Sequence, residues 1–269
     1  MLLENSFIYF PTRYPDGVWA PNKAYLQGRQ FPKTEDCWMQ SSDGVRIHGW
    51  YCVPHVAIGA DEAEEVPADT VILWFHGNAG NLSYRYDLIV MLMTLPAKVL
   101  IIDYRGYGRS GGRPSEEGLY RDARAAWDYL LTERGWRPDQ IVIFGKSLGG
   151  APAVDLASQV QAAGLIVQSS FTSIPDMAAA TMPFVPRFLV RTKMNSIDKI
   201  GAVHYPKLFV HGPKDEVVPY RLGRRLFDAA PEPKRFHDVP NAGHNETYIV
   251  GGEDYIEAFR KFLEECRKE

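Results

Sequence analysis

The segment IVIFGKSLGG, residues 141–150, decides the fold. Its first four residues, 141–144, are apolar and mostly β-branched, which predicts a strand buried on both faces of a sheet. The pattern GxSxG follows at once, and helix-forming residues begin at Leu148. A strand that turns sharply through this pattern into a helix exposes its serine hydroxyl at the edge of the sheet. Ser147 is therefore the candidate nucleophile.

Short β-branched runs alternate with helix-like segments on both sides of this turn, as in a parallel α/β sheet. The predicted buried strands are residues 71–75, 99–103, 141–144, 165–168 and 208–210, and residues 236–239 are the final strand candidate. The predicted helices are residues 82–95, 115–134, 148–160, 221–230 and 254–266, and Ser115 is the predicted N-cap of the second. We expect one α/β domain over residues 1–269, with a mostly parallel sheet of about eight strands and helices on both faces.

Three segments lie outside this alternation. Residues 37–40 and 45–53 flank a Ser-Asp-Gly turn, which predicts an antiparallel hairpin at the start. Residues 57–69 are acidic and poor in large apolar side chains, so we expect an exposed loop. Residues 171–200 are too long for a simple connection and carry apolar and basic residues with two prolines, which predicts a short lid.

Composition narrows the class of protein. Of the 269 residues, 45% are hydrophobic and 23% are charged, values that exclude a mainly disordered chain. The net charge of −3 gives no electrostatic reason to expect a nucleic-acid partner. No apolar run approaches the roughly 20 residues of a membrane-spanning helix, and the first residues lack the basic start of a signal peptide. We therefore expect no integral membrane segment and a cytoplasmic location.

The three cysteines predict neither a metal site nor a disulfide framework. Cys37, Cys52 and Cys266 have no metal-type spacing. Cys37 and Cys52 could face each other across the hairpin, but two buried thiols in strands are the favoured interpretation. No metal and no organic cofactor are expected.

A second GxSxG occurs at residues 108–112, around Ser110. It lies in a glycine-rich loop with Pro114 before its helix, so Ser110 is interpreted as a loop residue. The same loop contains GxGxxG, at Gly106, Gly108 and Gly111, which raises a dinucleotide-binding alternative. In that fingerprint the glycines open directly into a helix, whereas here Arg113 and Pro114 intervene, and the alternative is disfavoured.

A serine hydroxyl needs a base within hydrogen-bond reach and a third group to orient that base. In enzymes with this turn, the acid and then the histidine follow the serine, on loops after later strands. Asp215 lies just past residues 208–210, and His244 lies in a glycine-bearing loop after residues 236–239. We therefore predict Asp215 as the acid and His244 as the base. The competing residues are the acids Asp103 and Asp198 and the bases His76, His204, His211 and His237.

Five motifs in this order resemble serine hydrolases of the α/β-hydrolase superfamily, in particular the α/β-hydrolase-domain group that includes protein depalmitoylases. They are HGNAGN (76–81), DYRGYGRSGGRPSEEGLY (103–120), FGKSLGG (144–150), HGPKDEVVP (211–219) and AGHNE (242–246). The resemblance implies that Ser147, Asp215 and His244 are nucleophile, acid and base. The glycine loop at residues 106–112 is also a family feature.

The loop that begins at His76 follows the first buried strand, which is where the α/β-hydrolase fold has its oxyanion loop. His76 is accordingly interpreted as structural. The backbone N–H groups of Asn78 and Leu148 are the expected donors to the oxyanion.

The expected function is hydrolysis of small-molecule carboxylic esters, with short to medium acyl chains, through an acyl-serine intermediate. Thioesters react through the same steps, so an acyl-protein or acyl-CoA thioesterase is an alternative. A non-catalytic ligand-binding protein with a hydrolase fold is the alternative of another class. Met182, Phe184 and Phe188, in the predicted lid, are expected to line the acyl pocket, with the two phenylalanines at its end. The sequence does not indicate the oligomeric state.

Overall fold

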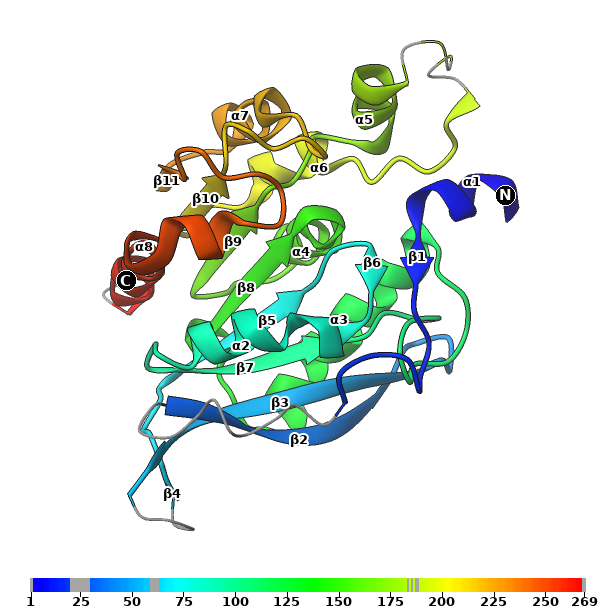
Figure 1. Ribbon diagram of the computed structural model, residues 1–269. Coiled ribbons are helices and arrows are strands. Elements are labelled where there is room, and N and C mark those ends of the chain that lie inside the picture. Colours follow the sequence, from blue (N-terminus) through cyan, green and yellow to red (C-terminus); the bar gives the residue numbers. More distant parts are fainter. Residues whose placement is uncertain are drawn as a thin grey trace.

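The computed structural model describes residues 2–19, 30–58, 63–182, 184, 186 and 189–267. In this part of the chain a nine-stranded sheet has the order β11-β10-β9-β8-β5-β7-β3-β2, with β4 beside β3 (Figure 1). Its strands are β2 (Gln30–Gln40), β3 (Arg46–Ala57), β4 (Ala63–Glu65), β5 (Thr70–Phe75), β7 (Ala97–Ile102), β8 (Ile141–Lys146), β9 (Gly164–Gln168), β10 (Lys207–His211) and β11 (Lys234–Asp238).

In the order of the sheet, β11, β10, β9, β8, β5 and β7 pair in parallel, and β3 pairs antiparallel with β7, β2 and β4. Every residue of β5, β8, β9 and β10 is buried, because helices cover both faces of the sheet. The predicted mostly parallel α/β sheet is therefore confirmed.

The opening hairpin is longer than predicted, and its register separates two cysteines. Cys37 pairs with Gly49, and Cys52 pairs with Thr34. Both thiols are free and buried, and burial raises the pKa of the Cys37 thiol to about 12. The favoured interpretation, two buried thiols in strands, matches this register.

The prediction that residues 57–69 form a loop throughout is wrong at β4. His55 at the end of β3 pairs with Glu65 of β4, although the side chains of β4 are all exposed. The long β3 extends past its other neighbour, so its free backbone groups recruit a strand without any apolar pattern. Hydropathy alone therefore could not reveal β4.

Helices cover the sheet in two layers (Figure 1). One layer contains α2 (Tyr86–Leu92) and α8 (Thr247–Cys266), and the other contains α3 (Glu116–Thr132), α4 (Gly150–Ala157) and α7 (Tyr220–Ala229). Ser115 caps α3 as predicted, since its side chain accepts a hydrogen bond from the N–H of Gly118. The helix α8 begins earlier than predicted and is kinked at Gly252, whose φ is 50°, because Gly251 and Gly252 interrupt the helical pattern.

The predicted lid contains α5 (Ile174–Thr181), the short α6 (Ser196–Lys199) and the turn η6 (Ile200–Ala202). Facing α5 is an N-terminal helix, α1 (Leu2–Ile8), which no sequence pattern predicted (Figure 1). Strand β1 (Phe10–Pro11) continues it and pairs with β6 (Ala79–Gly80). None of the helices in the described residues is long and apolar enough to span a membrane.

Candidate active site

Ser147 lies in a sharp turn between β8 and α4, formed by η4 (Ser147–Gly149). Its φ of 54° falls in the left-handed region, which residues other than glycine rarely adopt. The two glycines of the motif are required by close approach. A Cβ on Gly145 would lie 2.5 Å from the Gly149 carbonyl oxygen, and a Cβ on Gly149 would lie 2.0 Å from that of Phe75. The backbone therefore has the geometry of a nucleophile elbow.

The structure brings together the three residues that chain order predicted. His244 Nε2 lies 2.9 Å from Ser147 Oγ, and His244 Nδ1 lies 2.8 Å from Asp215 Oδ2. They follow β8, β10 and β11 in turn. Because the carboxyl ends of parallel strands share one edge of the sheet, three loops far apart in sequence converge there.

Asp215 is held in one orientation by several donors. Its Oδ1 accepts hydrogen bonds from the N–H groups of Val217 (2.9 Å) and Val218 (2.7 Å). Its Oδ2 lies 3.1 Å from His211 Nε2. Burial raises the pKa of Asp215, but the hydrogen bonds from His211 and His244 outweigh it and hold the pKa well below its ordinary value. The carboxylate is therefore charged at neutral pH.

The competing acids and bases have other surroundings. His211 Nε2 contacts Asp215 Oδ2 and also lies 3.1 Å from the Val218 carbonyl oxygen. His237 lies 3.4 Å from Asp254, His204 is exposed, and Asp198 is an exposed residue of α6. Asp103 is fully buried and accepts a hydrogen bond from the N–H of Leu82 at 2.8 Å.

His76 is buried beneath the loop that carries Asn78. Its Nδ1 lies 2.7 Å from the Gly77 carbonyl oxygen and its Nε2 lies 3.6 Å from Asp103. Burial lowers the pKa of His76, against the opposing effect of Asp103. These contacts fit the structural interpretation of His76.

The loop after β5 is held by contacts on both sides of Asn78. The Asn78 side chain donates to the Ile8 carbonyl at 3.1 Å, and the Asn78 carbonyl accepts from the Tyr107 hydroxyl at 2.8 Å. Leu148 is the second residue of η4, and the first N–H groups of a helix have no partner within it. Asn78, Leu148 and Ser147 line one cavity.

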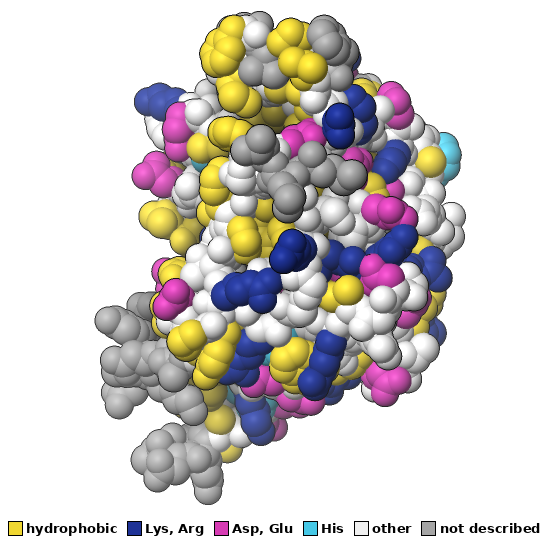
Figure 2. Space-filling view, turned by 90° about the vertical axis from the view of Figure 1, so that its right-hand side faces the viewer, with side chains coloured by type: hydrophobic (Ala, Val, Ile, Leu, Met, Phe, Trp, Pro, Cys, Tyr) yellow, Lys and Arg dark blue, Asp and Glu magenta, His cyan; other side chains and the backbone are white. Residues whose placement is uncertain are grey.

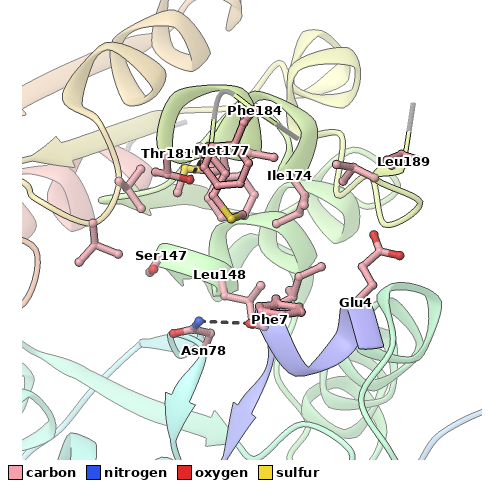
Figure 3. A pocket seen from close by; sticks show the side chains of 17 residues that line it. Glu4, Phe7, Asn78, Ser147, Leu148, Ile174, Met177, Thr181, Phe184 and Leu189 are labelled. Carbon is pink, nitrogen blue, oxygen red and sulfur yellow. Dashed lines mark hydrogen bonds between the residues drawn. The ribbon is translucent and has the colours of Figure 1, made fainter. Parts of the chain in front are cut away.

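That cavity has a volume of about 580 Å³ and lies between α5 and α1, with Ser147 at one end (Figure 3). Its lining is mostly apolar: Glu4, Phe7, Ile8, Asn78, Ser147, Leu148, Phe171, Ile174, Met177, Ala178, Thr181, Met182, Phe184, Leu189, Val190, Val217 and Val218. Apolar side chains gather on the face of the molecule that carries α1 and α5 (Figure 2). Met182 and Phe184 lie along the cavity, and Phe188 lies outside the described residues.

The wall that α1 contributes to the cavity was not predicted from the sequence. Glu4 of α1 accepts hydrogen bonds from the N–H groups of Arg191 and Thr192, both at 2.8 Å. This carboxylate ties α1 to the end of the predicted lid. The one feature of the sequence that could have indicated this wall is the apolar, aromatic character of residues 1–10.

Comparison with known proteins identifies relatives of this chain. A family model described as serine aminopeptidase S33 matches residues 66–200. The Mycobacterium tuberculosis protein Rv2307c is 40% identical over 97% of this chain and 88% of its own length. The Arabidopsis thaliana protein WAV2 is 36% identical over 87% of this chain and 80% of its own. Human alpha/beta hydrolase domain-containing protein 17B is 34% identical over 73% and 67%.

The structure of the Pyrococcus furiosus esterase Pf2001 matches with a TM-score of 0.73, over 95% of this chain and 98% of that one, at 18% identity. At such low identity the likeness shows the fold. The sequence relatives show more: the chain belongs to the α/β-hydrolase family. Its named relatives WAV2 and 17B are α/β hydrolase domain-containing proteins.

Proposed function

We propose that this chain is a serine hydrolase that cleaves carboxylic esters with short to medium acyl chains. The observation that carries the proposal is the hydrogen-bonded series Asp215, His244 and Ser147, with Ser147 opening into an apolar cavity. A nucleophile, a base and an orienting acid at these distances are the requirements of covalent acyl transfer.

In the proposed mechanism, Ser147 Oγ attacks the ester carbonyl as His244 Nε2 takes its proton. Asp215 fixes the tautomer of the imidazole and stabilises its charged form. The N–H groups of Asn78 and Leu148 donate to the oxyanion. His244 then gives its proton to the departing alcohol, and water, activated by the same histidine, cleaves the acyl-serine.

The cavity between α5 and α1 is the proposed acyl pocket. Met177, Met182 and Phe184 line it from the lid side, and Phe7 lines it from α1 (Figure 3). Each methylene that enters such a pocket contributes roughly 0.8 kcal/mol. The chain-length preference should therefore rise from acetate until the pocket is filled.

The test is turnover of p-nitrophenyl acetate, butyrate, octanoate and palmitate, beside acyl thioesters of the same chains. We expect burst kinetics, an optimum at butyrate or octanoate, and complete dependence on Ser147. Higher kcat/KM on the thioesters would favour the thioesterase alternative. No turnover of any substrate and no labelling by a fluorophosphonate would favour a ligand-binding protein.

A further inference from the structure

Lys146, the residue before Ser147, has an unusual environment. Side chains of β8 alternate between the two faces of the sheet, and Val142 and Phe144 pack with α2 and α8. The same alternation directs Lys146 to that face, at the carboxyl end of the strand. Lys146 is only 8% exposed, and lysine is rarely so buried without a partner.

No hydrogen bond or ion pair within the described residues engages the Lys146 ammonium. The Lys146 ammonium nitrogen lies 5.8 Å from the centroid of the Tyr248 ring. Burial and the nearby Arg85 lower the pKa of Lys146 to about 8, and Asp215 opposes this shift. Asp215 itself is already engaged by two histidines and two backbone N–H groups. The ammonium is therefore short of acceptors.

Arg85, at the end of η2 (Leu82–Arg85), is a second cation with an unmet donor. Its Nε is buried and has no hydrogen-bond partner among the described residues. One of its terminal nitrogens donates to the Ala79 carbonyl. Among the described residues no carboxylate forms an ion pair with Arg85, and burial lowers the pKa of its guanidinium. A buried donor without an acceptor costs free energy, so the buried Arg85 Nε close to a second cation, Lys146, requires an explanation.

The position of Lys146, Arg85 and Tyr248 next to the reacting groups supplies an explanation. Lys146 precedes Ser147, Tyr248 follows His244 by four residues in the first turn of α8, and Arg85 binds the residue after Asn78. None of the three lines the apolar cavity. Tyr248 packs with the apolar cluster that α2 and α8 share, and Arg85 directly precedes α2, whereas the cavity is lined by residues of α5 and α1. Figure 1 shows α2 and α8 apart from α5 and α1.

We propose that Lys146, Arg85 and Tyr248 bind an anionic group, a phosphate, sulfonate or carboxylate, on the leaving-group half of the ester. The proposal rests on the proposed function and narrows its substrate class to acyl esters of anionic alcohols. An oxyanion would accept from the Lys146 ammonium, the Arg85 Nε–H and the Tyr248 hydroxyl. Such charge-assisted hydrogen bonds are strong, and the low local dielectric strengthens them further.

The test compares two esters of equal acyl length, 4-sulfophenyl octanoate and the neutral 4-(methylsulfonyl)phenyl octanoate. For each ester, kcat/KM of a variant is divided by kcat/KM of the unmodified protein, so that differences in leaving-group reactivity cancel. We expect Lys146→Met and Arg85→Met to lower kcat/KM on the sulfonate by about tenfold to a hundredfold, the effect of losing one hydrogen bond to a charged group. On the neutral ester the change should stay within about threefold, and Lys146→Arg should retain most of the discrimination.

Lys214→Met is the matched control, because it removes the same charge from an exposed lysine beside Asp215. It should leave the ratio between the two esters unchanged. An equal loss on both esters in Lys146→Met, or an equal shift of the ratio in Lys214→Met, would overturn the proposal. The first result would assign Lys146 to support of the elbow or of Asp215.

Binding separates this proposal from the proposed function. In a Ser147→Ala background, calorimetry should detect tighter binding of the sulfonate ester than of the neutral ester, and Lys146→Met should abolish the difference. If the unmodified protein turns over neither ester but the difference in binding is present, the proposed hydrolase function is refuted and the anion site is retained. If it turns over the esters but the difference in binding is absent, the anion site is refuted and the hydrolase function is retained.

Discussion

Residues 145–149 and residues 108–112 share the pattern GxSxG, but their two serines have different backbone conformations and different hydrogen-bond partners. Ser147 has a φ of 54°, and its hydroxyl lies 2.9 Å from His244 Nε2. Ser110 is also buried, but its hydroxyl donates to the Asp103 carbonyl at 2.7 Å and accepts from the N–H of His48 at 2.8 Å. The first hydroxyl is presented to a cavity and the second joins two backbone segments. The pattern around Ser147 follows a strand directly and leads directly into a helix, whereas the pattern around Ser110 lies in a loop.

The sharpest test of this contrast is removal of each hydroxyl. Ser147→Ala should lower ester turnover by a factor of about 10⁶ and abolish fluorophosphonate labelling. Ser110→Ala should keep labelling and most turnover, while it loses about 1–3 kcal/mol of unfolding free energy because the His48 N–H and the Asp103 carbonyl lose their partner. Labelling that survives Ser147→Ala and disappears in Ser110→Ala would reverse the assignment.

The second effect in size concerns the acid. Asp215→Asn should lower kcat by a factor of about 10⁴, because an amide no longer selects the required imidazole tautomer. Asp198→Asn, on the exposed side of α6, should change kcat by less than about twofold. Steady-state kinetics on p-nitrophenyl butyrate measure both. If Asp198→Asn had the larger effect, the acid would follow an earlier strand than β10.

A third test compares Gly145, the first glycine of its pattern, with Gly111, which occupies a variable position of the other pattern. A Cβ at Gly145 would meet the Gly149 carbonyl oxygen at 2.5 Å, whereas a Cβ at Gly111 would have no neighbour nearer than 3.5 Å. Gly145→Ala should therefore cost about 1–3 kcal/mol of unfolding free energy and impair turnover. Gly111→Ala should cost less than about 0.5 kcal/mol. Urea denaturation measures both, and equal costs would contradict the claim that close approach requires a glycine at position 145.

The smallest expected effect is at the rim of the cavity that serves Ser147. Phe184 lines this cavity but is 81% exposed, so Phe184→Ala should shift the chain-length optimum by only a few fold toward longer acyl groups. The half-buried Met177 is the matched comparison, and Met177→Ala should shift it more. The measurement is kcat/KM across the ester series. An unchanged profile in both variants, with lowered thermal stability in Met177→Ala, would assign these side chains to packing.

The sequence predicted best those elements whose burial is continuous. Strands such as β5 are buried at every residue, so their apolar runs are legible without tertiary information. The positions of Asp215 and His244 were predictable for a related reason, since the loops after parallel strands must meet at one edge of the sheet. Strand β4 was not, because its pairing depends on the length of β3 and on none of its own side chains.

The parts of the site that could not be predicted depend on packing between distant elements. The α1 wall exists because Glu4 finds two free N–H groups almost the whole length of the chain away. Arg85 and Tyr248 approach Lys146 only because α2 and α8 share one face of the sheet. Neither arrangement leaves a periodic pattern in the residues involved.

The bond between Glu4 and the lid segment has a practical consequence for anyone who prepares this protein. The first helical turns carry part of the wall of the cavity, so we expect an affinity tag fused next to Met1, or removal of the first seven residues, to alter the volume offered to a substrate without removing any contact of Ser147, His244 or Asp215. Two laboratories with differently tagged protein would then measure different chain-length preferences and equal rates of fluorophosphonate labelling. Protein with a C-terminal tag, compared with protein trimmed after Phe7, would expose this dependence directly.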